Sequence, residues 1–213
     1  MSALESFKKI QENVNQINNK VTIVVVSKTF SIAKVQPLIN SGHLDYGENK
    51  VQEAKEKWLQ YLDTNSNIKL HMIGRLQTNK AYDAVKLFDY VHSLDNEKLA
   101  IKLSLYEKDM SKKLKYFIQV NVDDEVHKSG IAPDKLKDFF KFCKIDYGLN
   151  VIGLMCLPSI NSNLSITFSK LKALAKDVNL TELSMGMSSD YKIAIQNGAT
   201  FIRIGSNIFG NRN

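Results

Sequence analysis

A lysine at the end of an aliphatic segment is the first residue in the chain with a clear chemical potential. Lys28 ends the segment VTIVVVSK (21–28), and on a strand it would share a face with Val24 and Val26. An ammonium at the rim of an apolar surface is partly desolvated, which lowers its pKa and makes the amine a better nucleophile toward an aldehyde. A surface lysine that extends its charge into water is the alternative interpretation.

An arginine lies inside a second apolar segment, near the end of the chain. Arg203 belongs to FIRIGS (201–206), where it shares one strand face with Phe201 and Gly205. A buried guanidinium is costly unless a partner accepts its hydrogen bonds. Two interpretations fit this position: a structural arginine satisfied inside the protein, or an arginine that faces a ligand.

Small polar residues and glycines follow two of the apolar segments. SMGMSSD (184–190) leads into a helix expected over 191–199. Three residues could supply the N-cap of this helix: Ser188, Ser189 or Asp190. A helix N-terminus can hold a phosphate through its unpaired N–H groups, and Gly205–Ser206 offers further N–H groups and a hydroxyl. A phosphate site is therefore predicted here, with a routine cap as the alternative.

The elements that position these residues alternate along the chain. Eight apolar segments are expected to be strands: 21–28, 43–49, 69–74, 89–95, 115–121, 151–157, 181–187 and 201–206. Amphipathic helices are expected between them at 31–42, 51–62, 96–110, 163–177 and 191–199. Several strands are nearly continuous in large aliphatic residues, which is typical of strands covered on both faces. The alternation predicts a parallel α/β fold.

Two architectures fit this alternation. A doubly wound open sheet would place a glycine-rich loop after its first strand, but VVVSKTFS contains no glycine. The count of eight strands favours a single (β/α)₈ TIM barrel over residues 1–213, with an additional N-terminal helix up to about Lys20. In such a barrel the functional groups lie at the carboxyl ends of the strands, where the residues singled out above occur.

Composition excludes several classes of protein. Hydrophobic residues make up 44% of the chain, as in ordinary globular proteins, and no apolar run approaches the roughly 20 residues of a membrane span. The net charge of +7 comes from lysines spread among acidic residues, which indicates solvated helix faces at 53–58 and 136–144 rather than a nucleic-acid site. Cys143 and Cys156 form no metal-binding pattern. We expect a cytoplasmic protein with reduced thiols, no metal and no secretory signal.

Six segments together resemble the YggS/PROSC family of pyridoxal 5′-phosphate (PLP) homeostasis proteins. They are VVVSKTF, YGENKVQEAKEK, HMIGRLQTNK, FIQVNVDDEVHKSGI, VIGLMCLPS and ELSMGMSSDYKIAIQNGATFIRIGSNIFGNR. The resemblance runs from about Val21 to Arg212 in the family's order and spacing. It implies a fold-type III PLP protein, similar to the N-terminal barrel of alanine racemase but without the second, β-rich domain of that enzyme.

The resemblance also implies roles for individual residues. Lys28 matches the family's Schiff-base lysine, and Arg203 matches the arginine that faces the pyridine nitrogen of PLP. Three more positions match the family's phosphate-binding residues: Ser188, Gly205 and Ser206. Asn49 and Met185 match residues that line the cofactor pocket. Lys128 is a second lysine of the family and a weaker candidate for transient PLP capture. Asn207 departs from the family, in which a smaller residue is common at this position.

Three positions of the HMIGRLQTNK motif could serve either structure or binding: His71, Gln77 and Asn79. A structural role is at least as well supported for them as a contact with the cofactor.

The arginine at the pyridine nitrogen bears on function, because arginine does not release its proton and leaves that nitrogen unprotonated. The ring is then a weak electron sink, which disfavours carbanion chemistry. The expected function is storage and delivery of PLP as a Schiff base, without catalytic residues or turnover, by a monomer that hands PLP to apo-enzymes. The alternatives are an amino-acid racemase of the alanine racemase type and an unrelated barrel enzyme acting on a phosphorylated metabolite.

Overall fold

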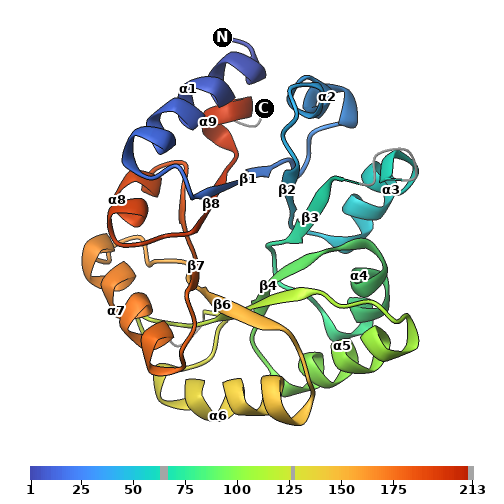
Figure 1. The fold of residues 1–213 in the computed structure, drawn as a ribbon, viewed down its shortest axis with the longest axis vertical. Coiled ribbons are helices and arrows are strands. Elements are labelled where there is room, and N and C mark those ends of the chain that lie inside the picture. Colours follow the sequence, from blue (N-terminus) through green and yellow to red (C-terminus); the bar gives the residue numbers. More distant parts are fainter. Residues whose placement is uncertain (63–66, 126–127, 211–213) are drawn as a thin grey trace.

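Eight parallel strands close into a barrel in which each strand pairs with its neighbours in the chain (Figure 1). The structure is a computed structural model that describes residues 1–62, 67–125 and 128–210. The strands are β1 (Thr22–Val26), β2 (Asp45–Glu48), β3 (Lys69–Met72), β4 (Tyr90–Leu94), β5 (Lys115–Gln119), β6 (Val151–Met155), β7 (Glu182–Met187) and β8 (Phe201–Ile204). Each lies within a segment expected to be a strand, and the predicted (β/α)₈ barrel is confirmed.

Helices surround the barrel (Figure 1). They are α1 (Ala3–Ile17), α2 (Ile32–Asn40), α3 (Val51–Leu62), α4 (Ala81–Leu87), α5 (Glu97–Asp109), α6 (Leu136–Lys141), α7 (Leu164–Asp177), α8 (Tyr191–Gln196) and α9 (Ser206–Phe209). Short 3₁₀ turns precede α4 (Thr78–Lys80) and α6 (Pro133–Lys135), and a π-helical turn, Phe142–Asp146, continues α6. The longer helices were predicted, whereas α4 and α9 have too few turns to show an amphipathic period.

The N-terminal helix α1 covers the place where the barrel closes. A capping box starts the helix, with Ser2 and Glu5 each accepting from the other's backbone N–H. Phe7, Ile10 and Val14 recur on one face of α1 and are buried. The helix packs against α2, α8 and α9, outside β8 and β1 (Figure 1). The additional helix expected before the first strand is therefore part of the outer ring.

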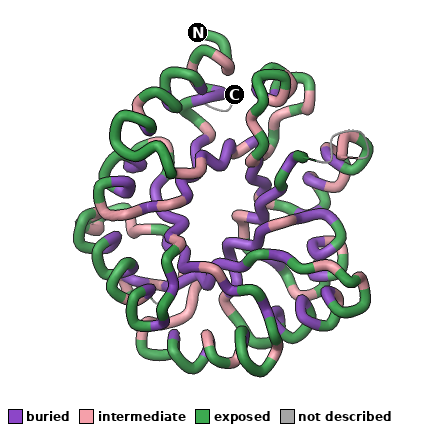
Figure 2. The backbone as a smooth tube through the Cα atoms, in the orientation of Figure 1, coloured by how far each residue is buried: buried purple, intermediate pink, exposed green. Residues whose placement is uncertain are grey.

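Apolar side chains form two separate clusters. The larger cluster fills the layer between the strands and the helices, and buried positions follow the strands while exposed ones lie on the outer sides of the helices (Figure 2). The smaller cluster lies inside the barrel and contains Val24, Tyr90, Phe117, Met155 and Phe201. Filling the interior with side chains makes the barrel a packed core rather than a pore.

No helix in the described ranges is both long enough and apolar enough to cross a lipid bilayer.

Candidate ligand-binding site

A cavity of about 980 Å³ opens at the carboxyl ends of the strands. Residues that follow β1, β2, β3, β5, β6, β7 and β8 line it. Six of the residues that the sequence singled out as cofactor-binding are among them: Lys28, Asn49, Ser188, Arg203, Gly205 and Ser206. The fold therefore brings together positions from both ends of the chain, as a barrel site requires.

A tight turn carries Lys28 to the rim of the cavity. The strand β1 ends at Val26, and Phe30 N–H donates to Ser27 O at 3.1 Å across the turn. Thr29 has a φ of 68°, in the left-handed region that is uncommon for a residue with a side chain, and its N–H donates to Glu53 Oε1. These contacts fix the backbone on both sides of Lys28, so its side chain leaves from a defined point.

The fully buried carboxylate of Glu48, the last residue of β2, supports this turn. Glu48 Oε1 accepts from Ser27 Oγ at 2.6 Å, from Lys57 Nζ at 2.8 Å and from Trp58 Nε1 at 3.0 Å. Lys57 Nζ also donates to Ser27 O at 2.7 Å. This group, the Glu48 cluster, joins the ends of β1 and β2 to α3. No role was predicted for Glu48, although a Lys–Trp pair nine and ten residues after a strand glutamate was a visible signal.

Arg203 forms part of the cavity floor and is 4% exposed. Its Nη1 donates to Ser184 Oγ at 2.6 Å and its Nη2 donates to Cys156 O at 3.0 Å. No carboxylate in the described part of the chain forms an ion pair with it. Burial lowers the pKa of Arg203, but the ordinary value is so high that the guanidinium stays charged. The result is a charged hydrogen-bond donor whose orientation is set by neutral acceptors.

Two buried histidines continue from Arg203 into the barrel interior. Ser184 Oγ lies 2.7 Å from His92 Nδ1, and His92 Nε2 lies 2.9 Å from His71 Nδ1. His71 Nε2 lies 3.1 Å from Asp45 Oδ1. Burial lowers the pKa of His71, and burial together with the nearby His71 and Arg203 holds that of His92 well below its ordinary value. His71 is fully buried and is not among the described residues that line the cavity.

The loops after β7 and β8 form a polar corner on another side of the cavity. Ser188 Oγ accepts from Gly205 N at 3.3 Å and from Asn207 N at 3.4 Å. Asn207 Nδ2 donates to Ser188 O at 2.7 Å. We call Ser188, Gly205, Ser206 and Asn207 the loop corner. Asn207, where the family commonly has a smaller residue, joins the two loops through these hydrogen bonds.

The helix α8, which follows the loop corner, offers less to a bound phosphate than the sequence suggested. Asp190 is the N-cap residue of α8, but its carboxylate accepts from Met187 N in the preceding turn rather than from the helix. The helix is only six residues long. Backbone N–H groups and hydroxyls of the loop corner, rather than a long helix dipole, are therefore the groups available to an anion.

Met185, which the resemblance places in the cofactor pocket, is not among the described residues that line the cavity. It is fully buried in the layer between strands and helices. Gly186 has a φ of 93°, and the pairing of β7 with β8 shifts register between Ser184 and Met187. This irregularity turns Met187 toward the cavity instead, because it breaks the alternation of faces along the strand.

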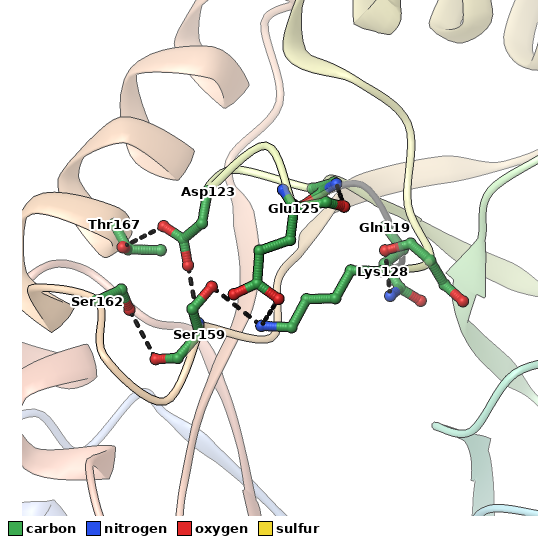
Figure 3. Close-up of polar contacts among 9 residues, drawn as sticks. Gln119, Asp123, Glu125, Lys128, Ser159, Ser162 and Thr167 are labelled. Atoms are coloured by element: carbon green, nitrogen blue, oxygen red, sulfur yellow. Dashed lines mark hydrogen bonds and ion pairs between the residues drawn. The ribbon is translucent and has the colours of Figure 1, made fainter.

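Lys128 lies at the rim, in a network that joins the loops after β5 and β6 (Figure 3). Its Nζ lies 3.3 Å from Glu125 Oε2 and donates to Ser159 Oγ at 3.1 Å. Asp123 accepts from Ser159 N at 2.8 Å and from Thr167 Oγ1 at 2.7 Å. The two residues that precede Lys128, 126 and 127, lie outside the described residues. The ammonium is thus already paired at the edge of the cavity.

Gln77 and Asn79 are exposed, on the 3₁₀ turn before α4, and neither is among the described residues that line the cavity. In the described ranges, no group of three or more histidine, cysteine, aspartate and glutamate side chains is placed to hold a metal ion. Both cysteines are buried and unpaired, and burial raises the pKa of each thiol to about 12.

The donors of the cavity suit one class of ligand. An amine stands at the rim, a buried guanidinium donor at the floor, and N–H and hydroxyl groups at the loop corner. These groups match an anionic molecule that carries a phosphate, a hydrogen-bond acceptor and a carbonyl carbon open to an amine.

Comparison with known proteins gives one consistent result. The family model described as alanine racemase, N-terminal domain, matches residues 6–213. A pyridoxal phosphate homeostasis protein of Synechocystis is 37% identical over 201 residues, which cover 90% of this chain and 92% of that protein. A protein of the same name from Pseudomonas aeruginosa is 38% identical over 197 residues, with 90% and 85% covered.

Solved structures agree with these relatives. The structure of PipY from Synechococcus elongatus with PLP bound has a TM-score of 0.89 and 30% identity, and covers 98% of this chain and 100% of that one. An alanine racemase of Clostridium difficile has a TM-score of 0.72 at 12% identity, and the match covers 95% of this chain but 56% of the enzyme. The second likeness shows the fold alone.

The buried histidines make stability depend on pH. His71 and His92 are fully buried and His43 is partly buried, and in each case burial is the main cause that lowers the pKa of the ring below its ordinary value. The unfolded chain therefore takes up protons near pH 6.5 that the folded chain does not, so their contribution is present above that pH and lost below it. We expect the free energy of unfolding to fall between pH 7.5 and 5.5 by up to about 1.4 kcal/mol per histidine.

Urea unfolding at pH 7.5, 6.5 and 5.5 measures this dependence. The variant His92→Gln keeps an amide donor and acceptor but no titrating ring, and its stability should change less with pH than that of the wild-type protein. A free energy of unfolding that is constant or increases toward pH 5.5 in the wild-type protein would contradict the expectation.

Proposed function

This chain belongs to the family of pyridoxal phosphate homeostasis proteins, and on that premise we propose that it binds PLP through Lys28 for storage and delivery within the cell. The observation that carries the proposal is the meeting of three groups in one cavity: Lys28, the Arg203 guanidinium and the loop corner. PLP has one feature for each of them, namely an aldehyde, a pyridine nitrogen and a phosphate. The residues present therefore fit the cofactor.

Lys28 provides the covalent attachment. PLP would supply an aldehyde, and the Lys28 amine would hold it through a reversible covalent bond formed with loss of one water. The turn at Thr29 and the Glu48 cluster hold the backbone from which Lys28 extends, so that the amine is presented at one place on the rim. A reversible link on a fixed residue is suited to holding a cofactor that must later be given up.

Arg203 holds the ring end without activating it. Its guanidinium can only donate, and the described residues place no carboxylate in an ion pair with it. A donor of this kind leaves the pyridine nitrogen unprotonated, which keeps the bound ring a weak electron sink. This property supports a holding function over carbon–hydrogen bond cleavage.

The loop corner holds the phosphate. Ser188 Oγ accepts two backbone hydrogen bonds, so its own proton remains available to an anionic oxygen. Ser206 adds a second hydroxyl, and both loops are tied by Asn207. Hydrogen bonds to a charged acceptor are stronger than neutral ones, which makes this corner the main source of selectivity for a phosphorylated ligand.

We extend the proposal to the absence of turnover, to a monomer and to apo-enzymes as recipients of PLP. Racemisation needs an acid–base group on each face of the ring. Among the described residues of the cavity lining, Lys28 and Lys128 carry amines, whereas the arginines cannot release a proton. Lys128 is paired with Glu125 and Ser159, which makes it a poor second base.

The Lys28→Ala variant tests the covalent site. It should lose the visible absorbance of covalently bound PLP and the adduct fixed by borohydride, because the attacking amine is gone. Its fold should be retained, since the contacts that shape the turn come from neighbouring residues. Mass spectrometry after reduction measures the adduct, and Lys128→Ala, which should keep it, is the control. A full-occupancy adduct on another lysine in Lys28→Ala would show that Lys28 is not the principal site.

The variants Ser188→Ala and Ser206→Ala test the phosphate site. Each should weaken PLP binding by about 1–3 kcal/mol, because each removes a hydrogen bond to a charged acceptor. Pyridoxal, which has no phosphate, should bind weakly and respond little to either change. Titrations of both ligands compare the variants with Ser129→Ala, a cavity serine of the β5 side. If pyridoxal and PLP lose the same affinity, the phosphate lies elsewhere.

A chiral assay tests the absence of turnover. With micromolar protein over hours, the assay would detect rates far below the 1–1000 s⁻¹ that is typical of enzymes. We expect no interconversion of D- and L-alanine, while added amines should still displace the lysine from the bound cofactor. Interconversion that disappears in Lys28→Ala would favour the racemase. Sedimentation tests whether the protein is a monomer. Measurements of PLP transfer to apo-enzymes test the recipients.

A further inference from the structure

Arg203 stands at one end of an unbroken chain of hydrogen bonds through the barrel interior. The contacts run from Arg203 to Ser184 at 2.6 Å, to His92 at 2.7 Å, to His71 at 2.9 Å and to Asp45 at 3.1 Å. They cross from the cavity floor to the amino-terminal end of β2. We call these five residues the interior relay.

The two ends of the interior relay fix its direction. The Arg203 guanidinium can only donate, and the ionised Asp45 carboxylate can only accept. His71 and His92 are fully buried, which favours the neutral ring with one donor and one acceptor nitrogen. His71 therefore donates from Nε2 to Asp45, and its Nδ1 accepts from His92.

The same reasoning determines the remaining bonds. His92 carries its proton on Nε2, so its Nδ1 accepts the hydroxyl proton of Ser184. The oxygen of Ser184 is then left as an acceptor for Arg203 Nη1. Every donor in the interior relay points toward Asp45, and no donor opposes another.

Among the described residues, the surroundings of the interior relay offer the histidine ring nitrogens no other hydrogen-bond partner. Tyr90 stacks on His71 with ring centroids 4.2 Å apart, and Phe117 stacks on His92 at 4.4 Å. In the described part of the chain each ring nitrogen has the one partner given above. Changing the protonated nitrogen of one histidine therefore requires changing that of the next.

We propose that the interior relay positions Arg203 for the ring nitrogen of the cofactor, and that Asp45 sets its direction from the opposite end of the barrel. The part that concerns the cofactor rests on the proposed function; the direction of the relay does not. With Asp45 absent, nothing holds the His71 proton on Nε2, and His92 can place its proton on Nδ1. Ser184 would then receive two donors and its hydroxyl proton would need another acceptor, which weakens its hold on Arg203.

Histidine tautomers in the protein without added PLP test the direction. In long-range ¹H–¹⁵N NMR spectra of ¹⁵N-histidine-labelled wild-type protein, both rings should be protonated on Nε2. In Asp45→Ala, His92, which Asp45 does not touch, should lose this exclusive form and show protonation on Nδ1. Asp45→Asn keeps an oxygen acceptor and should restore the wild-type spectrum.

Asp89→Ala provides the matched control. Asp89 accepts from Leu70 N at 2.8 Å, at the same end of the barrel, but it is not part of the interior relay. This variant should lose stability without moving the His92 proton. Protonation of His92 on Nδ1 in the wild-type protein, or an unchanged His92 in a folded Asp45→Ala, would overturn the proposed direction. Should Asp45→Ala fail to fold, the wild-type spectrum still tests the direction, because protonation of either ring on Nδ1 would contradict it.

Ligand binding tests the positioning. Asp45→Ala should bind PLP and pyridoxal about tenfold more weakly, by the same factor, because both carry the ring nitrogen. That equality separates this effect from the Ser188 and Ser206 variants, which should affect PLP alone. Unchanged affinity in a variant whose His92 proton has moved would overturn the positioning role. Failure of the wild-type protein to bind PLP would contradict the proposed function, and the tautomer result would stand by itself.

Discussion

Pairing of β8 with β1 closes the barrel, and the candidate site depends on it. In this register Val24 lies beside Arg203 and Val25 beside Ile204. Val24 and Arg203 both point into the barrel, so the strand that leads to Lys28 runs alongside the strand that carries the floor of the cavity. Parallel pairing then places the loop after β8 next to the turn after β1. The N-terminal helix α1 covers this seam from outside, which gives the ring of helices a part in holding the site together.

The Glu48 cluster shows how a charge inside the protein serves position rather than stability. Glu48 is fully buried and the side chain of its partner Lys57 is 8% exposed, and a buried ion pair gains little over an apolar pair of the same volume. Removing one partner is different, because it strands the other charge in the core. The cluster therefore resists small rearrangements of Ser27, to which it binds through both the hydroxyl and the carbonyl. The backbone of Lys28 is held in place as well, because Lys28 is the next residue in the chain.

Features that depend only on the residues of one segment could be predicted from the sequence. The strand TIVVV was recognised because it is apolar throughout, and Arg203 stood out because it interrupts such a segment. The place of Met187 in the cavity lining was not predicted, because Gly186 breaks the alternation of the strand, which the letters alone do not reveal. The interior relay was missed for another reason. His71, His92 and Ser184 come from three strands, and only their register and the inward faces bring them within hydrogen-bond distance.

The tie between Ser188 and Asn207 bears on the entropy of binding. Two loops that would otherwise sample many conformations are joined by side-chain-to-backbone hydrogen bonds that involve no ligand. A ligand that enters this corner meets a preorganised surface and loses little affinity to the ordering of loops. The same corner persists after the ligand departs, so one molecule can replace another without local refolding. The proposed function requires the same small molecule to be accepted and released many times, and rigidity of this kind favours rapid exchange.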